Sequence, residues 1–231
     1  MRIFPRVASI LLLAVFAVAA PVDDPMVRAW ADRISKTAIL LEAKDYSSAL
    51  RLANRSVSEM VDHLGPGDGS AKWFGVVLTH KALALAGLGD HEEALWYWYT
   101  VLGIYPKLAE TDLSSFGEAG AFLKAHLTPP EPAKLIGDPT KAVVPPKLVK
   151  RVHPEFPQGA ADFFASGALV VEVVIGTDGR VKSPRIIHPL DAPTLSYAAL
   201  EAVKRWKFEP ARVENVPVEV LFNLTVNYKP R

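Results

Sequence analysis

The feature that most constrains the fold is a strict alternation of residue types near the end of the chain. From position 218 to 228 the even-numbered positions are apolar or aromatic, whereas the odd-numbered ones include Asn223, Thr225 and Asn227. Successive side chains of a β-strand point to opposite faces of a sheet. This stretch therefore predicts a strand with one buried face and one mostly polar face.

Two further strands and a helix are predicted before this stretch. Residues 168–177 are rich in β-branched side chains, and residues 180–188 resume a strand-like pattern. Asp178 and Gly179 between them tolerate positive φ, so the two segments predict a β-hairpin. Residues 191–208 repeat apolar side chains at helical spacing. The members of that stripe are Leu195, Ala199, Val203 and Trp206.

The order strand, strand, helix, strand limits how the sheet can be assembled. If the helix returns the chain along one face, the last strand most simply pairs antiparallel with the first and becomes an edge. An edge strand presents unpaired N–H and C=O groups, which are an aggregation hazard unless a partner occupies them. The sequence therefore predicts a pairing edge at the last strand.

Residues 20–128 are predicted to form a helical domain. Apolar residues recur every three or four positions at 27–41, 46–64, 73–88 and 92–105, and a closing helix is expected at 112–126. Residues 45–50 and 90–95 both place an acidic residue at a turn and Ala-Leu in the next helix. On these residues the region resembles tetratricopeptide repeats, although the two copies are not at the period of about 34 residues typical of that family. A helical bundle without a binding groove is the alternative.

An aromatic cluster at residues 96–99 (Trp-Tyr-Trp-Tyr) lies in the fourth of these helices. Trp98 and Tyr99 share the predicted core face, whereas Trp96 and Tyr97 point elsewhere. These two side chains could line a concave ligand surface. Packing against a neighbouring helix is the interpretation that we favour.

The N-terminus has the pattern of a secretory signal peptide at residues 1–19. Arg2 and Arg6 precede an apolar run at 7–20, and small residues at 17–19 precede two aspartates. The run is shorter than the roughly 20 residues that a membrane-spanning helix needs. We therefore expect export across the membrane with cleavage of this segment. An uncleaved inner-membrane anchor is the alternative, and membrane contact is expected only in that case.

Residues 129–146 are predicted to be a linker because they are rich in proline. Proline has a fixed φ and no amide hydrogen, so it disfavours regular elements. The prolines are Pro129, Pro130, Pro132, Pro139, Pro145 and Pro146.

Residues 147–231 resemble the TonB C-terminal domain family, the periplasmic module of energy transducers that contacts outer-membrane transporters. Four segments carry the resemblance in order. They are the opening at 152–160, the Gly, alternating valines and Asp-Gly at 167–179, the helix with its Trp-x-Phe-x-Pro-Ala exit at 206–211, and the strand that follows Val216-Pro217-Val218.

The resemblance implies a mode of binding. In the family the last strand accepts an extended transporter segment by strand addition, in which main-chain hydrogen bonds supply affinity. Carried over by position, the candidate contact residues are Leu221, Asn223, Thr225 and Asn227. The chain departs from energy-transducing members in two respects. Its apolar segment has Ser9 but no histidine, and helices replace the long proline-rich spacer that follows the anchor in those members.

Enzymatic chemistry is not expected. The six histidines form no H-E-x-x-H pattern, and no serine lies in a G-x-S-x-G elbow. With no cysteine, thiolate metal sites and disulfides are excluded. No cofactor or metal site is predicted, and a net charge of +1 argues against a general nucleic-acid binder.

The predicted fold class is α + (α+β). Antiparallel helical hairpins are joined by the linker to a three-stranded antiparallel sheet with helices on one face. The predicted function is a periplasmic TonB-like protein that binds an extended segment of an outer-membrane transporter or another envelope protein in TonB-dependent transport. An anchored energy transducer and a scaffold for envelope complexes are the alternatives, and a second copy of the chain is a further candidate partner.

Overall fold

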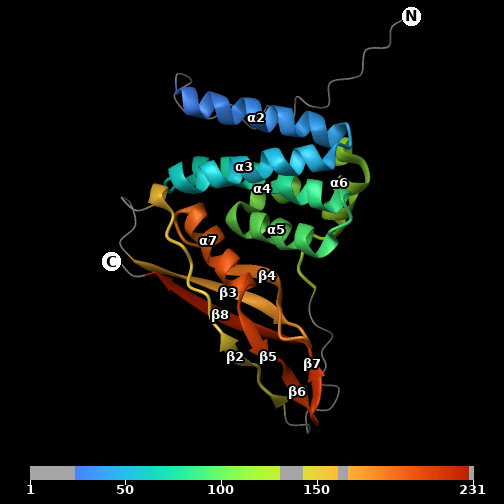
Figure 1. Ribbon diagram of the computed structural model, residues 1–231, viewed down its shortest axis with the longest axis vertical. Coiled ribbons are helices and arrows are strands. Elements are labelled where there is room, and N and C mark those ends of the chain that lie inside the picture. Colours follow the sequence, from blue (N-terminus) through green and yellow to red (C-terminus); the bar gives the residue numbers. More distant parts are fainter. Residues whose placement is uncertain (1–23, 131–142, 161–165, 229–231) are drawn as a thin grey trace, which may run out of the picture.

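The computed structural model describes residues 24–130, 143–160 and 166–228. The predicted signal peptide lies outside these residues, as does most of the predicted linker. Figure 1 shows a stack of helices above a twisted sheet region, with the first helix farthest from the sheet. Within the described ranges, no helix has both the length and the apolar character required to cross a bilayer.

The helices expected from the sequence are present in the N-terminal part of the structure. Two helical hairpins are followed by two 3-10 turns and a shorter helix. The elements are α2 (Pro25–Glu42), α3 (Tyr46–His63), α4 (Asp68–Gly87), α5 (His91–Ile104), η1 (Pro106–Glu110), η2 (Ser114–Phe116) and α6 (Gly117–Ala125).

The repeated acidic residues are helix caps. The Asp45 carboxylate accepts a hydrogen bond from the Ser48 amide at 3.1 Å, and Asp90 accepts one from the Glu93 amide at 3.3 Å. Each satisfies one of the amides that a helix start leaves unpaired. Local capping therefore accounts for the acidic residue that the two segments share.

Helix α4 is the centre of the helical part. From Phe74 to Ala86 every residue except Lys81 is buried, as expected for a helix that is apolar all round. Helices α3, α5 and α6 all contact it. A Cβ atom on Gly75 would lie 2.8 Å from Leu108 Cδ1 of η1. Residues of η1 and α6 therefore cover this side of α4.

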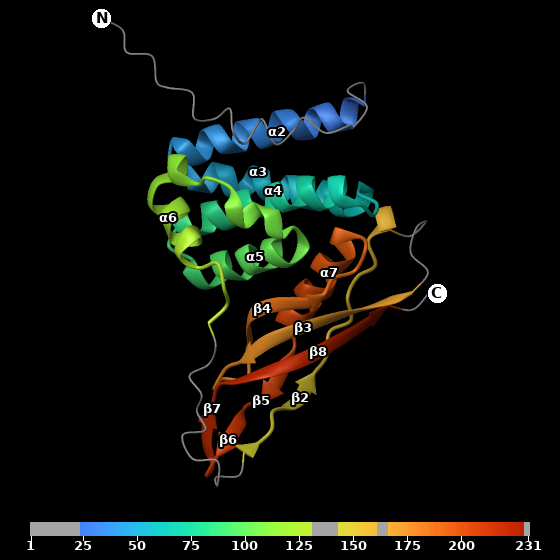
Figure 2. The same cartoon turned by 180° about the vertical axis from the view of Figure 1, so that it is seen from behind.

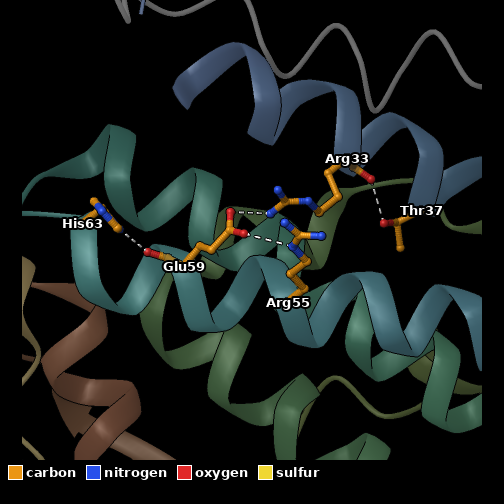
Figure 3. A network of polar contacts seen from close by, with 5 residues as sticks. All are labelled: Arg33, Thr37, Arg55, Glu59 and His63. Atoms are coloured by element: carbon orange, nitrogen blue, oxygen red, sulfur yellow. Dashed lines mark hydrogen bonds and ion pairs between the residues drawn. The ribbon is translucent and has the colours of Figure 1, made fainter. Parts of the chain in front are cut away.

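An ion-pair network holds α2 to α3 (Figure 3). Arg33 Nη1 lies 2.6 Å from Glu59 Oε2, and Arg55 Nε lies 3.1 Å from Glu59 Oε1. The hydrogen bond from Arg33 keeps the pKa of Glu59 below its usual value. Thr37 Oγ1 donates to the Arg33 carbonyl at 2.7 Å, and His63 Nδ1 lies 2.7 Å from the Glu59 carbonyl. Both ends of the network are thus tied to the backbone.

The main sheet has the topology predicted from the sequence. Strands β3 (Gly167–Ile175) and β4 (Val181–His188) form the hairpin, α7 (Pro193–Lys204) follows, and β8 (Val220–Tyr228) pairs antiparallel with β3. The strand order is β4-β3-β8. Gly179 closes the hairpin with φ +73°.

Helix α7 is shorter than predicted. It ends at Lys204, because Lys207–Glu209 form a strand, β5. The Phe208 amide donates to the Gly179 carbonyl at 3.0 Å, so this segment is tied to the hairpin turn. Trp206 therefore lies beyond the helix and not on its apolar stripe, although it is buried. A tertiary contact overrides the helical pattern here.

Short strands that were not predicted from the sequence form two smaller sheets. Strands β1 (Val143–Val144), β6 (Ala211–Val213) and β7 (Val216–Val218) form one, in the order β1-β6-β7, and β2 (Lys147–Lys150) pairs with β5 in the other. The predicted last strand is interrupted at Glu219, which separates β7 from β8. Strand β1 lies inside the segment expected to be a linker.

The helices pack directly on the C-terminal sheet region. Figures 1 and 2 both show α5 beside β4, on the side away from β3, and α7 close to the helical stack. Trp96 and Tyr97 of α5 are buried, and Tyr97 stacks on Tyr197 of α7 with ring centroids 6.5 Å apart. They therefore pack against the C-terminal part. The buried apolar residues of both parts form one continuous core.

Candidate functional site

Strand β8 has the two faces that its sequence predicts. Leu224, Val226 and Tyr228 are buried, whereas the four predicted contact residues are exposed. These four are Leu221, Asn223, Thr225 and Asn227. The structure thus brings them together in one row on the solvent-facing side of a single strand. Leu221, at 41% exposure, is the apolar member of that row.

Strand β8 lies at the edge of the main sheet. Its register with β3 is continuous, from Gly167 opposite Tyr228 to Ile175 opposite Val220, with no bulge. In the part of the chain that the structure describes, β3 is the only strand that pairs with β8. Strand β8 contains no proline. Its outer margin is therefore a regular, extended backbone of the kind that can accept a further strand.

The opposite edge, β4, is built differently. Its register with β3 shifts twice, and Ser183 adopts φ +47°. Pro184 follows and has no amide hydrogen to donate. Helix α5 also lies alongside this strand. Irregular backbone and proline are features that discourage strand pairing, so the two edges of the sheet are not equivalent.

The exposed row on β8 carries no charge of its own. Asn223 lies opposite Glu172 of β3, and Glu172 forms an ion pair with Arg185 of β4. The neighbouring carboxylate is thus already paired within the sheet. Amide and hydroxyl groups on β8 can donate and accept hydrogen bonds, so this row is suited to an uncharged polar or apolar neighbour.

The buried face fixes β8 to the rest of the fold. The Tyr228 hydroxyl donates to the Leu195 carbonyl of α7 at 3.0 Å, and burial raises the pKa of Tyr228. The Phe156 ring meets the Tyr228 ring edge to face at 5.6 Å. At the other end Phe222 packs against Phe208 at 6.0 Å. The strand is therefore held by side chains at both ends.

Segment 152–157 contributes to this support in a way that the sequence did not reveal. Trp206 Nε1 donates to the Val152 carbonyl at 2.8 Å. Phe156 extends the aromatic contacts to the end of β8. The segment has no regular secondary structure, so no periodicity marks it. The isolated aromatic residue before Pro157 was the available signal.

The hairpin, the helix and the edge strand together define an α+β module, and comparison with known proteins shows which family this module resembles. Residues 152–230 match the family described as Gram-negative bacterial TonB protein C-terminal. This match covers the hairpin, α7 and β8, so the family resemblance extends over the whole main sheet.

The protein is similar over part of its length to Protein TonB of Vibrio cholerae serotype O1 (strain ATCC 39315 / El Tor Inaba N16961). The two are 28% identical over 85 residues, which cover 36% of this chain and 35% of the relative. The match thus spans about a third of the relative's length. No solved structure gave a significant match. The family match does not include the helices α2 to α6.

Proposed function

We propose that this TonB-like protein binds an extended segment of an outer-membrane transporter, or of another envelope protein, by strand addition to β8. The observation that carries the proposal is the regular outer margin of β8, which has no proline and no bulge. The uncharged row from Leu221 to Asn227 provides side-chain contacts, and the main chain provides hydrogen bonds. No catalytic residue is part of this function.

The proposed setting is the periplasm, in TonB-dependent transport. The similarity to a TonB protein supports this setting. We propose residues 1–19 as a cleaved signal peptide, 20–128 as a helical domain, 129–146 as a linker and 147–231 as the binding module. An anchored energy transducer would require residues 1–19 to be retained. No contact among the described residues favours that alternative or a scaffold function.

Hydrogen exchange measured by NMR tests strand addition directly. The probes are synthetic peptides that tile the periplasmic segments of outer-membrane transporters from the same cell. In an antiparallel pair the amides of alternate residues point to the partner strand, so β3 occupies one half of the β8 amides. A bound guest strand should therefore slow exchange at the other half, in a strict every-second-residue pattern.

Photo-cross-linking in envelope extracts provides the matched comparison. A cross-linking residue at Asn223 should capture a transporter, whereas one at Ile187, exposed on β4 of the same sheet, should not. Two results would show that β8 is not the binding edge. One is a peptide that slows hydrogen exchange only in the helices, and the other is equal capture of transporters from Asn223 and from Ile187.

A further inference from the structure

The contact between the helices and the module has an aromatic centre. Tyr197 of α7 meets Phe74 of α4 edge to face, with ring centroids 5.3 Å apart, and stacks on Tyr97 of α5 at 6.5 Å. Phe74 and Tyr97 are buried, and burial raises the pKa of Tyr97 and Tyr197. An exposed module would leave Tyr197 without these contacts. The aromatic side chains therefore belong to an interface between the two parts.

Charged groups surround this centre. Lys204 of α7 forms an ion pair with Glu93 of α5, and its Nζ lies 5.4 Å and 4.9 Å from the ring centroids of Trp96 and Tyr97. Lys81 Nζ of α4 lies 3.8 Å from the Tyr97 centroid. Cations placed over aromatic faces are attracted to them. The Lys204 contacts cross between the two parts and favour one relative orientation of α7 and α5, whereas the Lys81 contact lies within the helical part.

Two glycines let the backbones approach closely at this interface. A Cβ atom on Gly103 of α5 would lie 2.7 Å from Ile186 Cβ of β4. A Cβ atom on Gly159 would lie 2.7 Å from the carbonyl carbon of His63. Larger side chains at either position would push the two parts away from each other. The two glycines therefore permit close packing of the module against both α3 and α5.

Helix α5 lies alongside β4 and contacts it through the Ile186 side chain. Beyond Pro184, residues 185–188 (Arg-Ile-Ile-His) have the β-branched composition of a pairing strand. Ile186 is held against Gly103, and Ile187 is 43% exposed. If α5 moved away, the apolar side chains of this stretch would be exposed at the sheet edge. The register shift between Ile186 and His188 would limit its pairing to a short segment.

We propose that α5 covers the β4 edge, so that the helices keep the protein monomeric and leave β8 as the one pairing edge of the main sheet. The partner excluded at β4 is a second copy of the chain, whose equivalent strand offers the same short β-branched stretch. The helices thus have a role that does not depend on what binds β8.

Gly103→Leu in the full-length protein tests the proposal. The leucine would collide with Ile186 and displace α5, so the mass measured by light scattering after gel filtration should double relative to the wild type. Gly69→Leu is the matched control, because no atom lies within 4 Å of a Cβ at Gly69. That control should remain monomeric. Adding Ile187→Lys to Gly103→Leu should restore the monomer, since a charge on an edge strand discourages pairing.

A second variant covers the case in which Gly103→Leu does not fold. Lys204→Glu replaces the ion pair between α7 and α5 with two carboxylates that repel each other. This variant should therefore also displace α5 and produce a dimer. The double exchange Glu93→Lys with Lys204→Glu should return the protein to a monomer. A dimeric wild type would overturn the proposal, and so would folded Gly103→Leu and Lys204→Glu proteins that both remain monomeric.

Discussion

The buried histidine of α4 gives the most quantitative prediction. His80 is 1% exposed, and its ring meets Phe116 edge to face at 6.3 Å. Burial lowers the pKa of His80 from 6.5 to about 4. In the folded protein the ring therefore stays neutral at pH 5, whereas in the unfolded chain it is protonated below pH 6.5.

The sign of the effect follows from the protons bound in each state. Between pH 6.5 and pH 4 the unfolded state binds more protons than the folded state, so the free energy of unfolding falls as the pH falls. At about 1.4 kcal/mol per pH unit, His80 should remove about 2 kcal/mol of stability at pH 5 and about 3 kcal/mol near pH 4. Above pH 7 the stability contributed by the neutral ring is fully present.

Urea unfolding at pH 7.5, 6 and 5 measures this effect in the wild type and in His80→Leu. The variant should lose stability much less steeply with falling pH, because leucine does not titrate. His63→Leu is the control, since His63 is exposed on α3. The Glu59 pKa is lowered from 4.5, so its contribution is lost below this pH window. Equal pH slopes in the wild type and His80→Leu would refute the reasoning.

Three further substitutions test other contacts of the fold. Gly179→Ala should destabilise the module by more than about 2 kcal/mol, measured by thermal unfolding. The reason is that Gly179 has a φ of +73° and that the added Cβ would lie 1.8 Å from the Phe208 carbonyl oxygen. Trp206→Phe removes the donor to the Val152 carbonyl and should cost about 1 to 3 kcal/mol, while Trp fluorescence at that site is lost. Glu59→Gln should weaken the packing of α2 by about 1 kcal/mol, seen as faster hydrogen exchange in α2; unchanged exchange there would contradict the assigned ion pairs.

The sequence predicted the parts of the fold that repeat over many residues. The long alternation in β8, the Asp178-Gly179 turn and the helical spacing of Leu195 and Ala199 each extend over enough positions to show a period. The exposed row on β8 follows from the same alternation. These features are local, so they can be read without knowing what the chain contacts.

Contacts between distant segments could not be predicted in this way. Strands β1, β2, β5, β6 and β7 have two to four residues each, too few to show a period. Gly103 resembles any other helical glycine in the sequence, and its role depends on Ile186 more than 80 positions later. The orientation of Trp96 and Tyr97 away from the predicted core face was the available sign of a further packing surface. The sequence did not indicate that this surface belongs to the C-terminal module.

The uninterrupted register between β3 and β8 has a mechanical consequence. Tension along β8 would load its pairing with β3 in shear, so that the hydrogen bonds resist together and do not open one at a time. The nine residues of β8 are all paired with β3. A guest strand shorter than nine residues would make fewer such bonds, so a pull along the edge would detach the guest and leave the sheet intact.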